Sequence, residues 1–182
     1  MGVRPAVATR TGDGTKERPG RRAVVSSPAM SDSEIPAFRR AVLALNGGPS
    51  DARIVRLAAS QAARTKGIEL IAVHVVEIDW TLPLDADIAG RSEDAQRVLD
   101  LAEAAAETQR QTLEPVLLQA RDVAAAIVDE AIERGADLLV VGLPYRKRFG
   151  GEFAIGRTIP YILQNAPCTV WVVREPMSEE ST

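Results

Sequence analysis

Cysteine and histidine are nearly absent from this sequence. Its 182 residues contain one cysteine, Cys168, and one histidine, His74. A single cysteine excludes a disulfide framework within the chain and favours a reducing compartment, so we expect a cytoplasmic protein. A single histidine excludes metal sites built from several histidines. Because no second histidine exists to activate Cys168, we interpret it as a packed thiol. His74 is interpreted as a packed side chain that donates one hydrogen bond.

Aromatic residues, long apolar runs and excess charge are also scarce. Aromatic side chains make up 4% of the residues, hydrophobic residues 46%, and the net charge is -3. No apolar run approaches the roughly 18–20 residues that span a bilayer. The small net charge provides no overall attraction to nucleic acid or to an anionic membrane. We therefore expect one aliphatic-rich α/β domain, with no membrane span and no nucleic-acid partner.

The composition divides the chain into three parts. Residues 1–35 are rich in Gly, Pro, Arg, Ser and Thr and show no periodicity, which predicts a disordered basic N-terminal tail. This segment lacks the apolar centre of a secretory signal. A basic arm that contacts an acidic partner is the alternative interpretation. Residues 36–175 form the predicted domain, and residues 176–182 a short flexible C-terminal tail.

Within the domain, short apolar runs alternate with segments of helical periodicity. The predicted strands are 38–45, 68–76, 115–120, 137–142 and 169–173, and the predicted helices are 51–66, 92–111, 122–134 and 157–165. This alternation predicts parallel strands joined by right-handed crossovers. Ser50 or Asp51 is expected to cap the first helix and Asp122 the third. Pro115 is expected at the start of its strand or on a sheet edge, because it cannot donate a hydrogen bond.

The stretch from Asp137 to Thr158 carries the strongest functional signal. An apolar strand ends at Gly142, a basic loop follows, and Gly156 precedes a helix. Ligands of open α/β sheets bind at the carboxyl ends of strands, and a helix N-terminus favours an anion. The triplet 146–148 (Arg-Lys-Arg) either contacts phosphate or is simply solvated, and the sequence leaves both interpretations open. Residues 151–158 nearly match a P-loop, but the distance from the strand and the missing lysine argue against one.

Four segments resemble the universal stress protein (UspA-like) family. They are 42–47 (VLALNG), 72–75 (AVHV), 136–142 (ADLLVVG) and 162–174 (ILQNAPCTVWVVR), and the resemblance extends from about Arg40 to Arg174. It implies a Rossmann-like three-layer sandwich with a five-stranded parallel sheet in the order 3-2-1-4-5. It also implies a homodimer through the last strand and binding of ATP or another adenine nucleotide.

The nucleotide-binding members of this family carry a G-x2-G-x9-G-[ST] pattern. Gly142 and Gly156 match its first and last glycines, whereas Tyr145 replaces the middle glycine and the spacer is one residue longer. Arg157 occupies the Ser/Thr position, with Thr158 next to it. Asn46 replaces the family's aspartate after the first strand. The ligand-binding residues that the resemblance implies are Asn46, Val75, Gly142, Arg146, Gly156, Arg157 and Thr158.

Two functions from different classes follow. The first is a cytoplasmic stress-response or regulatory module that binds an adenine nucleotide, or a related phosphate ligand, without rapid turnover. The second is a ligand-free dimeric module that acts through protein partners. Residues 142–150 also resemble UspA-like domains attached to bacterial amino-acid transporters, which suggests transporter regulation. The sequence has no paired carboxylates at a plausible site and no nucleophile with a base, so we expect no enzyme, no catalytic residue and no metal site.

Overall fold

The computed structural model describes residues 38–65, 67–84, 90–143 and 155–174. The chain divides into the units Met1–Ile35 and Pro36–Thr182, and all described residues belong to the second unit. The predicted N-terminal and C-terminal tails and the candidate residue Arg146 lie outside the described residues. None of the described helices is long and apolar enough to cross a membrane.

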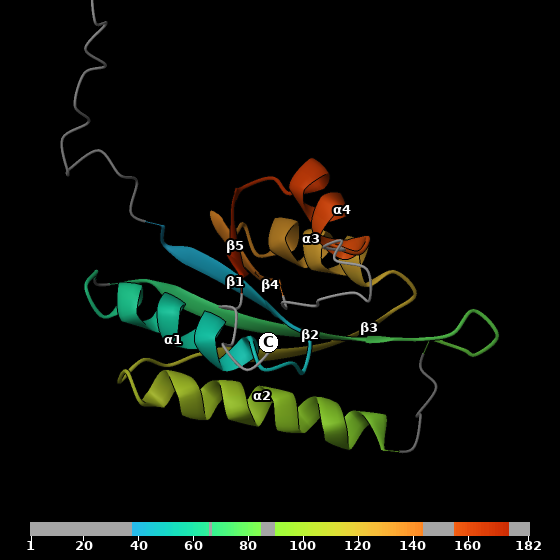
Figure 1. Ribbon diagram of the computed structural model, residues 1–182, viewed down its shortest axis with the longest axis horizontal. Coiled ribbons are helices and arrows are strands. Elements are labelled where there is room, and N and C mark those ends of the chain that lie inside the picture. Colours follow the sequence, from blue (N-terminus) through green and yellow to red (C-terminus); the bar gives the residue numbers. More distant parts are fainter. Residues whose placement is uncertain (1–37, 66, 85–89, 144–154, 175–182) are drawn as a thin grey trace, which may run out of the picture. The chain divides into compact units, whose positions relative to one another are not determined.

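Five parallel strands alternate with four helices along the described part of the chain (Figure 1). The elements are β1 (Arg40–Leu45), α1 (Asp51–Ala62), β2 (Glu69–Glu77), α2 (Arg91–Glu107), β3 (Glu114–Ala120), α3 (Val123–Glu133), β4 (Leu138–Leu143), α4 (Thr158–Asn165) and β5 (Thr169–Arg174). The strand order is β3-β2-β1-β4-β5, with every pair parallel. The α/β fold and the sheet order expected from the sequence are confirmed.

Helices cover both faces of the sheet. Figure 1 shows α1 and α2 on one face and α3 and α4 on the other. Successive side chains of β1 point to opposite faces, so Leu43 enters the core beneath α1 and α2 while Val42 enters the core beneath α3 and α4. Burial on both faces explains why β1 and β4 read as continuous apolar runs in the sequence.

The predicted end of α2 is wrong by about one turn. The helical pattern continued to residue 111, whereas α2 ends at Glu107. Arg110 adopts a φ of 55°, in the left-handed region, and the amide of Gln111 returns to the carbonyl of Ala106 at 3.2 Å. These contacts close the helix just after Ala106, its last apolar residue, so the polar residues that follow lie outside it.

The helix caps agree with the sequence in one case and differ in another. Asp122 caps α3, because its Oδ1 accepts hydrogen bonds from the amides of Ala124 at 2.9 Å and Ala125 at 3.0 Å. The expectation for α1 is wrong. Ser50 occupies the cap position but its side chain makes no capping bond. The carboxylate of Asp51 instead accepts from the turn that precedes the helix, as described below.

The edge strands have alternating exposure. Pro115 is the second residue of β3, an edge strand of the sheet, as predicted.

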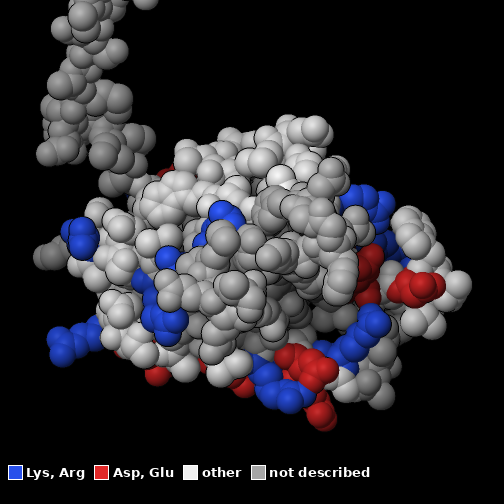
Figure 2. All heavy atoms as spheres, viewed as in Figure 1, with Lys and Arg blue, Asp and Glu red and all other residues white. Residues whose placement is uncertain are grey.

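On the face seen in Figure 2, acidic and basic side chains lie interleaved over α2, where Arg97 pairs with Asp94. This helix therefore presents charges of both signs.

Candidate functional site

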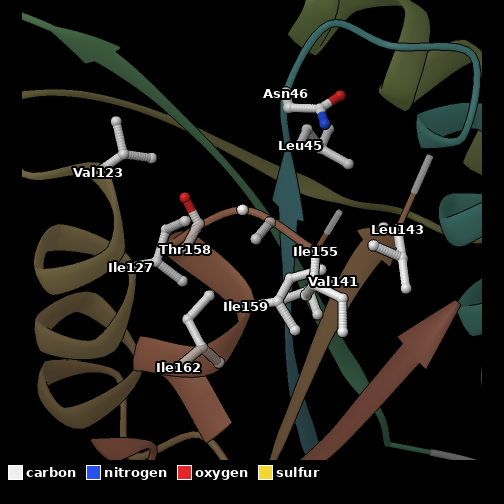
Figure 3. A pocket seen from close by; sticks show the side chains of 13 residues that line it. Leu45, Asn46, Val123, Ile127, Val141, Leu143, Ile155, Thr158, Ile159 and Ile162 are labelled. Atoms are coloured by element: carbon white, nitrogen blue, oxygen red, sulfur yellow. The ribbon is translucent and has the colours of Figure 1, made fainter. Parts of the chain in front are cut away.

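The carboxyl ends of the two central strands, β1 and β4, open into an apolar cavity of about 270 Å³, here called the β1/β4 cavity. Its walls come from four elements, which surround one space (Figure 3). The apolar side chains are Ala44 and Leu45 of β1, Val123 and Ile127 of α3, Ile159 and Ile162 of α4, and Val141 and Leu143 of β4. A recess lined in this way can hold a planar, largely apolar group.

Polar groups border the β1/β4 cavity on two sides. Asn46 follows the last residue of β1, and Thr158 opens α4. Gly156 lines the cavity with a φ of 74°, a conformation that side chains rarely adopt, and a Cβ there would meet no atom of the described residues within 4 Å. The side chain of Arg157 makes no capping bond to α4. The N-terminal turn of α4 can therefore receive an anion through its backbone amides.

Two further cavities adjoin the first. The arginine cavity, about 310 Å³, is lined by Arg121, Arg157, Thr158 and Tyr161 together with the acidic residues Glu77 and Asp122. Thr158 also lines the β1/β4 cavity, so this hydroxyl residue stands between the two spaces. A ligand in the apolar cavity could extend a polar end past Thr158 towards two guanidinium groups.

The third space, the α2 cavity, measures about 520 Å³ and lies between the ends of β1 and β2 and the first half of α2. Asn46, His74 and Val75 line it, with Arg91 and Arg97 on the side of α2. Asn46 lines both this cavity and the β1/β4 cavity. It is the shared residue of the two spaces.

The turn that holds Asn46 is fixed by hydrogen bonds. Oδ2 of Asp51 accepts from the amides of Asn46 at 3.1 Å and Gly47 at 2.7 Å. Oδ1 of Asn46 accepts from the amide of Gly48 at 2.8 Å. Burial raises the pKa of Asp51, while these backbone amides and the nearby His74 act in the opposite direction. The carboxylate thus stabilises the turn that precedes α1.

His74 packs as the sequence predicted. Its Nδ1 lies 3.0 Å from the carbonyl oxygen of Leu45. A carbonyl can only accept, so Nδ1 carries the proton and donates it. Cys168 is half-buried against the core beneath α3 and α4, and burial raises the pKa of its thiol. Within the described residues no group of three or more His, Cys, Asp or Glu side chains could hold a metal ion.

The predicted ligand residues fall into distinct places. Asn46, Gly142, Gly156 and Thr158 line the β1/β4 cavity. Of these three cavities, Val75, with 8% of its surface exposed, lines the α2 cavity and Arg157 lines the arginine cavity.

Sequence reasoning missed other residues at the site. The sequence does not mark the apolar walls from α3 and α4 as site residues, because helical periodicity reports burial but not which buried residues border a cavity. Arg121 had no motif to mark it, although its place directly after a predicted strand was a usable signal.

Comparison with known proteins agrees with this geometry. The universal stress protein family matches residues 37–174. The chain belongs to the universal stress protein family. The sensor protein KdpD of Mycobacterium tuberculosis (strain CDC 1551 / Oshkosh) is 30% identical over 146 residues, which cover 80% of this chain and 16% of KdpD. The chain thus spans about one sixth of that relative's length.

Solved structures of the family share the fold. A universal stress protein from Archaeoglobus fulgidus matches with a TM-score of 0.64 and 21% identity, covering 75% of this chain and 98% of that one. A universal stress protein from Archaeoglobus fulgidus in complex with dAMP matches with a TM-score of 0.59 and 22% identity, covering 75% of this chain and 98% of that one. A universal stress protein family protein from Arabidopsis thaliana with AMP bound matches with a TM-score of 0.56 and 15% identity, covering 79% of this chain and 97% of that one.

Proposed function

We propose that this universal stress protein is a cytoplasmic regulatory module of the stress response that binds an adenine nucleotide without rapid turnover. The nucleoside end lies at Asn46, against the apolar wall of the β1/β4 cavity and towards Val75. The phosphates lie at the first turn of α4, near Gly142, Gly156, Thr158 and Arg157. Arg146 is a further candidate from outside the described residues. The ligand is ATP, AMP or another adenine nucleotide.

One observation carries this proposal. An apolar recess at the carboxyl ends of the central strands adjoins a helix N-terminus whose cap residue is an arginine. A purine base and a phosphate group need these two environments side by side. Relatives of the same fold that hold dAMP and AMP support the choice of an adenine nucleotide.

The absence of rapid turnover rests on two side chains: His74, which lines the α2 cavity, and Cys168, which lies near Asp137 at the other end of the sheet from the cavities. The Nδ1 proton of His74 is donated to the carbonyl of Leu45, which removes that nitrogen from proton transfer. The thiol of Cys168 has a raised pKa and is therefore a poor nucleophile at neutral pH. We expect a nucleotide hydrolysis rate below about 1 s⁻¹, the low end of ordinary enzymes. Rapid release of phosphate from ATP would contradict this part of the proposal.

Binding is tested by mass spectrometry of ligands released from gently purified protein, followed by calorimetry with ATP, AMP and cAMP. Arg157→Ala should weaken binding by about 1.5–3 kcal/mol, the contribution of a charged hydrogen bond. Thr158→Val removes the hydroxyl group while keeping the side-chain shape. Arg56→Ala is the matched control, because it removes an exposed arginine from α1, on the opposite face of the sheet. A wild-type protein that releases no nucleotide and gives no heat with any of them would refute the proposal.

The second candidate is a ligand-free dimeric module that acts on protein partners, for example in the regulation of a transporter. The observation in its favour is the open edge of β5, which pairs only with β4 in the described part of the chain. Val172 of this strand is 38% exposed. An unpaired edge with apolar side chains can pair with a second copy. Light scattering should then give a dimer for the wild type and a monomer for Val172→Lys, and a wild-type monomer would exclude this dimer.

A further inference from the structure

Two side chains hold one peptide unit at the mouth of the proposed site. The carbonyl of Leu45 accepts from Nδ1 of His74 at 3.0 Å, and the amide of the next residue, Asn46, donates to Oδ2 of Asp51 at 3.1 Å. Both ends of the Leu45–Asn46 peptide are therefore bound by side chains from other elements, β2 and α1. The amide of Gly47 adds a third bond, at 2.7 Å to the same carboxylate oxygen.

The location of this peptide links it to ligand binding. Leu45 and Asn46 line the β1/β4 cavity, and Asn46 and His74 line the α2 cavity. The peptide thus lies where the two spaces meet. Asp51 is 9% exposed, so its bonds to the turn are largely shielded from water and hold the backbone firmly.

The same bonds decide what Asn46 offers to a ligand. Its Oδ1 accepts from the amide of Gly48, so the polar group of its side chain that has no partner among the described residues is the Nδ2 amide, a donor. A carboxylate at this position would offer an acceptor and would add a second negative charge beside the buried Asp51. The amide avoids that repulsion.

We propose that Asp51 and His74 are positioning residues of the nucleotide site, which hold the Leu45–Asn46 peptide so that Asn46 donates from Nδ2 to an acceptor atom of the ligand. This inference rests on the proposed function. The acceptor is a ring nitrogen of the base or a ribose oxygen of the nucleotide.

The chain supplies a matched control for the test. At the other end of β1, Asp137 accepts from the amides of Arg39 at 2.8 Å and Arg40 at 3.0 Å. Asp137→Ala therefore removes the same kind of carboxylate–backbone contact from the same strand, away from the cavities. Both Asp51→Ala and Asp137→Ala should lower the stability of the fold, whereas only Asp51→Ala should weaken ligand binding.

The experiment measures AMP binding by calorimetry on the full chain, with the folded fraction of each variant determined separately. Asp51→Ala and His74→Leu should each raise the Kd for AMP about fivefold or more, the equivalent of one net hydrogen bond. Asp51→Asn keeps an acceptor and His74→Asn keeps a donor at the Nδ position, so both should recover most of the affinity. Asp137→Ala should leave the Kd within about twofold of wild type.

Amide hydrogen exchange gives a readout that needs no ligand. The amides of Asn46 and Gly47 should lose protection in Asp51→Ala but not in Asp137→Ala. If the wild type binds AMP and Asp51→Ala binds it equally well, the positioning role is refuted while the proposed function stands. If the wild type gives no heat with AMP, ATP or cAMP, the proposed function fails and the positioning role with it. The exchange data then show a purely structural turn.

Discussion

Oγ of Ser50 lies 2.7 Å from the point that a Cβ on Gly142 would occupy. Cδ1 of Ile54 lies 2.9 Å from the same point. The packing of α1 against β4 therefore favours glycine at position 142, because any side chain there would have to displace these atoms. The family resemblance implies a ligand-binding role for this glycine. The structure supplies a different cause, on the opposite face of the strand from the β1/β4 cavity.

Gly142→Ala should destabilise the fold by about 1–3 kcal/mol, because the new methyl group overpacks against α1. The double variant Ser50→Gly with Gly142→Ala should lose less than the sum of the two single changes, since the nearest obstructing atom is gone. Urea unfolding of the four proteins measures this coupling. Additive losses would show that the methyl group is accommodated elsewhere.

Ser50→Ala should leave stability unchanged or raise it by about 1 kcal/mol. Oγ of Ser50 is buried and has no hydrogen-bond partner in the described part of the chain, so its removal relieves an uncompensated desolvation cost. Ser60→Ala is the control, because that hydroxyl donates to the carbonyl of Leu57 at 2.8 Å. Thermal unfolding of both variants decides the matter, and a clear loss for Ser50→Ala alone would contradict the prediction.

The stability of the Asp51→Asn variant relative to wild type should rise with pH. Burial raises the pKa of Asp51 above its ordinary value of 3.8. A raised carboxyl pKa contributes stability that is full below 3.8 and is lost as the pH rises through the folded-state value. The asparagine variant lacks this loss.

Urea unfolding from pH 3.5 to neutral pH should show this difference growing in favour of the variant. Asp79→Asn should show the opposite trend, because a hydrogen bond from Thr81 lowers the pKa of Asp79. Its stabilising contribution is therefore lost as the pH falls. If the stability difference from wild type changed with pH in the same direction for both variants, the opposite pKa shifts of Asp51 and Asp79 would be contradicted.

Cys168 should react slowly with iodoacetamide at pH 8. Burial, and after it the negative charge of Asp137, raises the pKa of the thiol above its ordinary value of 9.0. The thiolate fraction is therefore smaller than in a free cysteine, and Asp137→Asn should increase the rate. Alkylation followed by mass spectrometry measures both rates. A rate equal to or above that of glutathione would contradict this prediction.

Arg134→Met should cost about 1–3 kcal/mol, because it leaves the carboxylate of Glu130 without its partner. Glu130 is only 8% exposed and accepts from Nε of Arg134 at 2.7 Å, while Glu114 accepts from Nη1 at 2.6 Å. Arg97→Met removes a pair whose side chains are 69% and 70% exposed, and should cost clearly less. Urea unfolding compares the two, and equal losses would contradict the prediction.

The sequence alone determined the fold class and the elements that meet at the site. Apolar runs and helical periodicity depend on residues within a few positions, and they correctly predicted five strands and four helices. The strand order came from resemblance to a family, since no local pattern encodes which strands pair. The cap of α3 was predictable because Asp122 contacts amides two and three residues away.

Only the tertiary structure decided how the candidate residues are distributed. The sequence around Asp51 is typical of a helix N-cap, yet its carboxylate accepts hydrogen bonds from the turn before α1, near His74 of β2. Arg157 and Thr158 are adjacent in sequence and both line the arginine cavity, but of these two Thr158 also lines the β1/β4 cavity. Val75 lines the α2 cavity. Cavities form between segments as distant as β1 and α4, where packing and burial, rather than neighbouring residues, set the direction of each side chain.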